Sequence, residues 1–326
     1  MGGRTGNNSQ KAEHDFSPHT LSLLPQVTAC FCFRPESCLI SDKAFRDRSE
    51  GARIVNIISV QSFKGGTGKS TITANLAVTL AQLGKRVGVV DLDLEGPGLH
   101  VIFGVSDTEV KATINEVLQH KAPISQSVVD LTSKIQLKAG CLIFCPAGHK
   151  LDEILSILDS GFNLYTFKRV LEDLARDYNL DYLLIDSHPG IEKDTLLSMA
   201  LCDYLVLISR VDQQDLFGSG VMTEVASQLR KPVVLILNMV PSSVSEKEAS
   251  KIADRLAELF HLHVLTALPF NSDVLENLSK GVFVLEKPKD PLTKRFTEIA
   301  TKMLEAIETG LSDDVSANEP KSQSVA

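Results

Sequence analysis

The sequence predicts an α/β fold: a doubly wound, mainly parallel sheet with helices on both faces. Short apolar runs of strand length recur along the chain, and segments with apolar residues at helical spacing separate them. Continuously apolar strands are typical of parallel sheets, because helices cover both faces of such sheets. A glycine-rich loop joins the first strand to the first helix. Ligands in this fold class bind at the carboxyl ends of the strands, so we expect the functional residues there.

The expected elements alternate along the chain. The apolar runs that predict strands are residues 54–60, 86–91, 141–145, 181–186, 204–209, 233–237 and 264–268. Helical periodicity marks residues 72–83, 162–178, 214–229 and 246–260, and a single apolar stripe marks a last helix over 292–307. Gly84 ends the first helix. This alternation favours one large domain with tails on either side.

The loop after the first strand has the composition of a phosphate-binding loop. It reads Phe63-Lys64-Gly65-Gly66-Thr67-Gly68-Lys69-Ser70-Thr71. This fits G-x-x-x-x-G-K-[ST], except that Phe63 stands where the first glycine is usual. The glycines let backbone N–H groups approach a polyphosphate, and the following helix adds the positive end of its dipole. We expect Lys69 to reach the β- and γ-phosphates and Ser70 to ligate Mg²⁺.

Acidic residues end two of the predicted strands. Asp91 and Asp93 lie on the same side of the chain just past the strand 86–91, and Asp186 ends the strand 181–186. An aspartate after four apolar residues is a Walker B pattern, which holds Mg²⁺ through water. The patterns therefore predict Mg²⁺ ligands at Ser70 and Asp186. His188 lies in the loop after Asp186, and we expect a surface histidine without a catalytic role.

Lys64 and these motifs together resemble the ParA/MinD family, the deviant-Walker P-loop ATPases that dimerise around nucleotide. The resemblance covers roughly residues 52–307, and further matching segments are Leu268-Pro269-Phe270, Lys280-Gly281 and Lys287-Pro288. It implies that Lys64 crosses the dimer interface to the phosphates of the partner's ATP. Asp93 would orient the attacking water, and Asp91 would join Ser70 and Asp186 at the Mg²⁺ site. The segment Ser187-His188-Pro189-Gly190 resembles the family's second switch, where Ser-Pro-Ala-Gly is common, and Gly190 would donate its N–H to the γ-phosphate.

The resemblance also bears on the base. The strand 233–237 is followed by Asn238 but lacks the lysine and second acid of the guanine-reading pattern Asn-Lys-x-Asp, which favours adenine. Asn238 would contact the base edge, and Pro269, Phe270 and Asn271 would line its pocket. The predicted ligands are ATP and Mg²⁺.

Composition sets the context for these motifs. The net charge of −8 argues against a dedicated nucleic-acid binder, and no run of 18 apolar residues is present. Six cysteines without a regular framework suit a reducing cytoplasm. We expect a flexible N-terminal extension over residues 1–51, an ATPase domain over 52–309 and a disordered tail over 310–326. The expected location is cytoplasmic, with the periphery of the nucleoid or membrane left open.

The functional prediction is a slow, Mg²⁺-dependent ATPase that forms an ATP-bound homodimer and is stimulated by an unidentified activating protein. It would act as a nucleotide switch that positions or partitions a large cargo. Binding to nonspecific DNA or to a membrane surface is left open, but no clear motif supports either. The last helix carries mixed charges, which disfavours membrane binding. Two alternatives stay open: an ATP-dependent metallocluster carrier or chaperone, and a non-hydrolysing ATP-binding regulatory scaffold.

Overall fold

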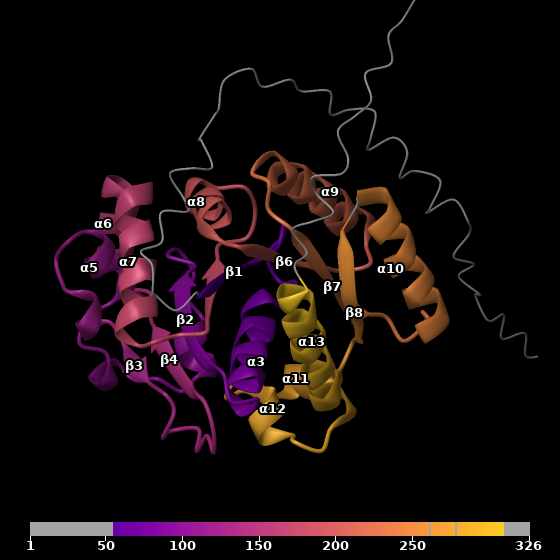
Figure 1. Ribbon diagram of the computed structural model, residues 1–326, viewed down its shortest axis with the longest axis horizontal. Helices are drawn as coiled ribbons and strands as arrows, with labels where there is room; N and C mark the ends of the chain where they lie inside the picture. Colours follow the sequence, from indigo (N-terminus) through magenta and orange to yellow (C-terminus); the bar gives the residue numbers. More distant parts are fainter. Residues whose placement is uncertain (1–54, 261, 278, 310–326) are drawn as a thin grey trace, which may run out of the picture. The chain divides into compact units, whose positions relative to one another are not determined.

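A computed structural model describes residues 55–260, 262–277 and 279–309. Within these residues the strands form one eight-stranded sheet in the order β3-β4-β2-β5-β1-β6-β7-β8 (Figure 1). Every neighbouring pair is parallel except β3 and β4. This confirms the predicted fold class. The predictions for the extension 1–51 and the tail 310–326 lie outside the described residues.

Each predicted apolar run forms a strand, with ends shifted by three residues or fewer. The strands are β1 Asn56–Gln61, β2 Arg86–Leu92, β3 Val129–Asp130, β4 Cys141–Cys145, β5 Tyr182–Ser187, β6 Tyr204–Ser209, β7 Val233–Val240 and β8 His263–Pro269. Sequence reasoning missed β3, because two residues are too short to show a period.

The helices also follow the predicted order. They are α3 Lys69–Gln82, α4 Leu99–Ile102, α5 Ile114–Leu118, α6 Leu151–Ser160, α7 Leu164–Asp177, α8 Lys193–Leu201, α9 Gln213–Gln228, α10 Glu246–Phe260, α11 Ser272–Glu276, α12 Phe283–Glu286 and α13 Pro291–Glu308, with 3₁₀ turns at Asp107–Glu109 and Ile124–Gln126. The short helices α4, α5, α11 and α12 and the separate helices α6 and α8 were not predicted. None of the described helices is both long and apolar enough to cross a membrane.

Two hydrophobic cores show why the sheet is covered on both sides. Successive residues of a strand point to opposite faces, so Val206 and Ile208 of β6 join one core while Leu205 and Leu207 join the other. The first core contains side chains of α3, α12 and α13, and the second contains side chains of α8, α9 and α10. Figure 1 shows these two groups of helices on opposite faces of the sheet.

Candidate functional site

The glycine-rich loop lies between the carboxyl end of β1 and the first turn of α3. Gly66 and Gly68 have positive φ angles of 76° and 86°, a conformation that side chains disfavour. A Cβ atom on Gly68 would also lie 2.5 Å from Asn238 Nδ2. No side chain caps α3, and its first turn carries no acidic residue. The free N–H groups and the positive dipole end are therefore left to an anionic ligand.

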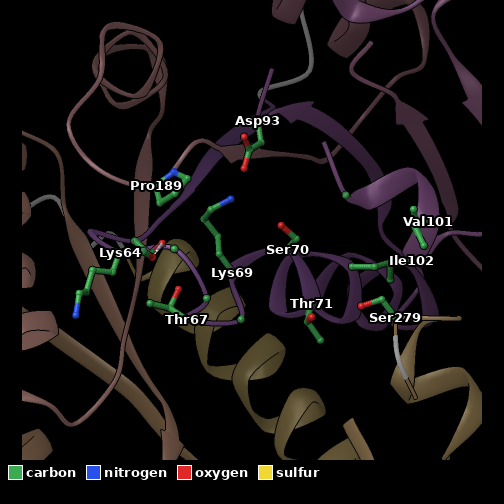
Figure 2. A pocket seen from close by; sticks show the side chains of 15 residues that line it. Lys64, Thr67, Lys69, Ser70, Thr71, Asp93, Val101, Ile102, Pro189 and Ser279 are labelled. Atoms are coloured by element: carbon green, nitrogen blue, oxygen red, sulfur yellow. Dashed lines mark hydrogen bonds between the residues drawn. The ribbon is translucent and has the colours of Figure 1, made fainter. Parts of the chain in front are cut away.

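A cavity of about 410 Å³ lies against this loop, a volume within the range of small-molecule sites. Its lining includes the predicted loop residues Lys64, Gly65, Gly66, Thr67, Gly68, Lys69, Ser70 and Thr71, together with Asp93. Val101 and Ile102 of α4 and Ser279 form its far side (Figure 2). Lys69 extends toward Asp93 in this view, whereas Lys64 points away from both. The structure thus brings together residues from three separate loops.

Lys69 is paired with Asp186 beneath the cavity. Lys69 Nζ donates to Asp186 Oδ1 at 2.8 Å, and the two side chains are only 6% and 1% exposed. Thr73 Oγ1 donates to the same oxygen at 3.2 Å. Asp186 Oδ2 and Thr67 Oγ1 are buried without a hydrogen-bond partner among the described residues. Buried polar atoms are rarely left unpaired, so these two oxygens fit a site completed by a bound ligand and its hydrated cation.

Asp91 lies beside Asp186, because the two residues are paired in register between β2 and β5. Burial, and then the neighbouring Asp186 carboxylate, raise the pKa of Asp91 to about 8. Its Oδ1 accepts from the N–H of Asp93 at 3.1 Å, and its Oδ2 accepts from the N–H of Leu99 at 3.3 Å. Asp91 therefore holds the loop after β2 in place, and its contact with Mg²⁺ stays a prediction.

Asp93 is held by two donors. Its Oδ1 accepts from the N–H of Gly96 at 3.1 Å and lies 2.9 Å from Nδ1 of His188. The expectation that His188 is a surface histidine without a role is wrong about its surroundings, because its side chain is 25% exposed and bound to Asp93. Sequence reasoning missed this contact, since 95 residues separate the pair. The contact could have been predicted only from the two residues following neighbouring strands, because Asp93 follows β2 and His188 follows β5.

Lys64 is directed toward α9. Its Nζ donates to Gln214 Oε1 and lies 3.9 Å from Asp215 Oδ1, and its side chain is 36% exposed. The preceding Phe63 packs so closely on Gly218 of α9 that no Cβ atom fits there. This contact explains why Phe63 stands in place of the usual loop glycine. The start of the loop is anchored on α9, away from the cavity that holds Lys69.

Gly190 has a positive φ of 98°, and its N–H donates to the carbonyl of Ser62 at 2.9 Å. In this conformation the predicted γ-phosphate donor is engaged at the start of the glycine-rich loop. Donation to a phosphate requires that this hydrogen bond be exchanged. The neighbouring Pro189 lines the cavity.

The residues predicted to bind the base lie outside the cavity lining. Asn238 Nδ2 donates to the carbonyl of Thr67 at 2.7 Å and so braces the glycine-rich loop. Asn271 caps α11 by accepting from the N–H of Asp273 at 2.8 Å. Pro269 and Phe270 are exposed at the end of β8, where the N–H of Phe270 donates to Val240. The adenine pocket stays a prediction.

Of the two cysteines of β4, Cys145 is a core residue and Cys141 is half-buried. Burial raises the pKa of both Cys141 and Cys145, and Cys145 is fully buried. No cluster of three or more histidine, cysteine or acidic side chains suited to a metal ion occurs among residues 55–260, 262–277 and 279–309. The basic residues near the last helix are partly neutralised: Arg295 pairs with Glu246 and Glu298, and Lys302 donates to the carbonyl of Leu265.

Comparison with known proteins identifies the family. The AAA-domain family matches residues 55–238, which span β1 to the end of β7 and include the cavity loop, Asp93 and Asp186. The chain belongs to the ParA/MinD-like family of P-loop ATPases. This membership confirms the resemblance expected from Lys64 and the neighbouring motifs, and it shows an ATP-binding protein.

Relatives of this ParA/MinD-like ATPase have several different functions. An uncharacterized ATP-binding protein of Methanocaldococcus jannaschii is 28% identical over 76% of this chain and 88% of its own. The flagellum site-determining protein of Helicobacter pylori is 27% identical over 82% and 87%, respectively. An iron-sulfur cluster carrier protein of Pyrococcus furiosus is 26% identical over 76% and 85%. Identity at this level therefore does not choose among these functions.

A solved structure shows the same fold. The septum site-determining protein MinD of Pyrococcus horikoshii, complexed with Mg-ADP, superposes with a TM-score of 0.64 at 22% identity. The match covers 78% of this chain and 99% of that protein.

Proposed function

We propose that this protein hydrolyses ATP with Mg²⁺, dimerises in the ATP state and serves as a nucleotide switch that positions or partitions a large cargo. The observation that carries the proposal is the buried Lys69–Asp186 pair below an uncapped helix N-terminus. This pair supports the proposal because a buried cation suited to phosphate and an unpaired carboxylate oxygen suited to a hydrated metal ion lie together at the carboxyl ends of the strands.

Different residues around the cavity would bind the phosphates and the Mg²⁺ ion. The N–H groups of Gly66, Gly68 and the first turn of α3 would donate to the triphosphate, as helix N-termini do. Lys69 would then exchange Asp186 for the β- and γ-phosphates. Ser70 and Asp186 would hold Mg²⁺, which neutralises phosphate charge when bound. Lys69 thus changes partner on nucleotide binding, and Asp186 keeps a cation beside it throughout.

Hydrolysis follows by in-line attack of water on the γ-phosphate. Asp93 lines the cavity and presents a carboxylate that orients this water. In the ATP dimer, Lys64 of each subunit reaches the phosphates of the other subunit, where it offsets charge that develops in the transition state. Its direction away from its own cavity supports this role.

Relatives support the switch function and one alternative. The flagellum site-determining relative favours the positioning of a cargo. The iron-sulfur cluster carrier favours a metallocluster carrier instead. Against that alternative, burial raises the pKa of both β4 cysteines, half-buried Cys141 and buried Cys145, which disfavours the thiolate that binds metal.

The test is phosphate release by the purified full chain with ATP and Mg²⁺, under single-turnover conditions. The proposal predicts slow but complete release that stops when Mg²⁺ is chelated. Tight ATP binding without release would contradict hydrolysis and favour the regulatory scaffold. Stoichiometric iron and sulfide in protein purified without oxygen would favour the cluster carrier.

A further inference from the structure

His188 links the two loops that follow β2 and β5, which are adjacent strands of the sheet. Its Nδ1 lies 2.9 Å from Asp93 Oδ1. An ionised carboxylate only accepts hydrogen bonds, so Nδ1 must carry the proton that it donates. The side chains are 25% and 14% exposed, which shields this charge-assisted hydrogen bond from most of the solvent.

The two carboxylate oxygens of Asp93 have different surroundings. Oδ1 accepts from both the N–H of Gly96 and His188, while no described residue donates to Oδ2. The final torsion of an aspartate is broad and rotates easily. Two donors on one oxygen restrict that rotation, which leaves Oδ2 free to accept from a water molecule in the cavity.

The histidine is itself held in place. Its carbonyl accepts from Thr195 Oγ1 at 3.2 Å, and Thr195 is fully buried in the first turn of α8. Two residues further on, Gly190 is bonded to the carbonyl of Ser62. The backbone of His188 is therefore held by α8 next to the imidazole, and before nucleotide binds the loop is also held at Gly190.

We propose that His188 is a positioning residue for ATP hydrolysis, which fixes Asp93 Oδ1 so that Oδ2 faces the attacking water. The inference rests on the proposed function, because it needs Asp93 to orient that water. His188 stands where the Ser-Pro-Ala-Gly form of the switch has proline, which cannot donate this hydrogen bond. A poorly oriented water slows the chemical step while leaving ATP binding unchanged.

The experiment compares kcat and KM for His188→Ala and His188→Asn. Alanine removes the donor, and we expect kcat to fall about tenfold with KM for ATP within about twofold of the parent value. Asparagine places an N–H at the same distance from the backbone as Nδ1, so it should recover most of the rate. A merely structural role would not favour asparagine over alanine. The matched control is His149→Ala, which removes a 3.2 Å contact with Asp107 outside the nucleotide cavity and should leave kcat unchanged.

A double-mutant cycle separates this inference from the proposed function. On an Asp93→Ala background, His188→Ala should slow single-turnover phosphate release no further, because the group that it positions is absent. If Asp93→Ala turns over at the parent rate, the role of Asp93 fails and the inference fails with it. If only Asp93→Ala is slow, while His188→Ala matches the parent or His188→Asn is as slow as alanine, the positioning role alone is overturned. Melting temperatures identify any variant that loses rate by unfolding. If His188→Ala is such a variant, the rate of the His188→Asn variant relative to the parent tests the positioning role.

Discussion

Two lysines of one loop stand in opposite environments. Lys69 is almost fully buried and paired with Asp186 beneath the cavity, while Lys64 is partly exposed and directed to Gln214 on α9. They are five positions apart in the sequence, yet their side chains point in different directions from the turn at Gly66 and Gly68. A lysine that binds its own subunit's nucleotide must lie in the cavity. A lysine that contacts the partner's nucleotide must be able to extend beyond its own subunit. The difference matches the proposed roles, in which Lys69 binds its own subunit's ATP and Lys64 contacts the partner's.

The largest expected effect follows from Lys69→Ala. ATP affinity, measured by calorimetry, should fall by about 100-fold or more, roughly 2.7 kcal/mol, because the triphosphate loses its main cation. The nucleotide-free protein should also lose about 3 kcal/mol of stability, since Asp186 is left buried without its cation.

Lys134→Ala is the matched control for this stability loss. It breaks an ion pair with Glu109 whose side chains are about one third exposed, so it should cost less than about 1 kcal/mol. Micromolar ATP affinity retained by Lys69→Ala would contradict the site assignment.

Lys64→Ala should separate turnover from binding. The rate of hydrolysis should fall at least about tenfold, roughly 1.4 kcal/mol of barrier, while the affinity of the monomer for ATP stays within about twofold. Phosphate release and calorimetry on the same preparation measure both quantities. A parallel loss of affinity would place Lys64 on its own subunit's nucleotide and remove the contrast with Lys69.

Gly218→Ala should disturb the start of the loop. The new methyl group meets the ring of Phe63, so we expect stability to fall by about 1–3 kcal/mol, as in overpacked cores. Adding Phe63→Gly removes the ring and should recover part of that loss in a denaturant titration. If Gly218→Ala is as stable as the parent, Phe63 does not anchor the loop on α9.

Asp91→Asn tests the buried carboxyl pair through pH. The pKa of Asp91 is raised to about 8 in the folded state, so the folded protein holds a proton that the unfolded chain releases above its ordinary value near 3.8. This carboxyl group therefore lowers stability progressively as pH rises from about 4 to 8.

Without nucleotide and Mg²⁺, the asparagine variant should melt below the parent at acidic pH, because its amide nitrogen cannot accept the backbone N–H that one carboxyl oxygen of Asp91 accepts. This deficit should shrink as pH rises toward about 8, because only the parent carries the ionising carboxyl group. A difference in melting temperature that stays constant across that range would show that Asp91 ionises as freely in the folded protein as in the unfolded chain.

Sequence reasoning located the fold and the residues around the cavity because both depend on local patterns. The apolar run ending at Asp186 indicates a strand end, and the glycines around Thr67 indicate a phosphate-binding loop. Neither prediction depends on residues far away in the sequence. The contacts of His188 with Asp93 and of Phe63 with Gly218 join segments far apart in the chain, and no local period records them. Asn238 shows a third case, because its place at a strand end was predictable, whereas its hydrogen bond to the loop carbonyl was not.

Light scattering with saturating ATP and Mg²⁺ tests the central contrast most directly. We expect the parent protein to have the mass of a dimer, and Lys64→Ala to stay a monomer that still binds ATP, because two nucleotides face each other in a dry interface without the cations that offset their charge. A parent protein that stays monomeric would contradict the shared-nucleotide mechanism, and a Lys64→Ala variant that dimerises as well as the parent would make Lys64 an ordinary loop lysine.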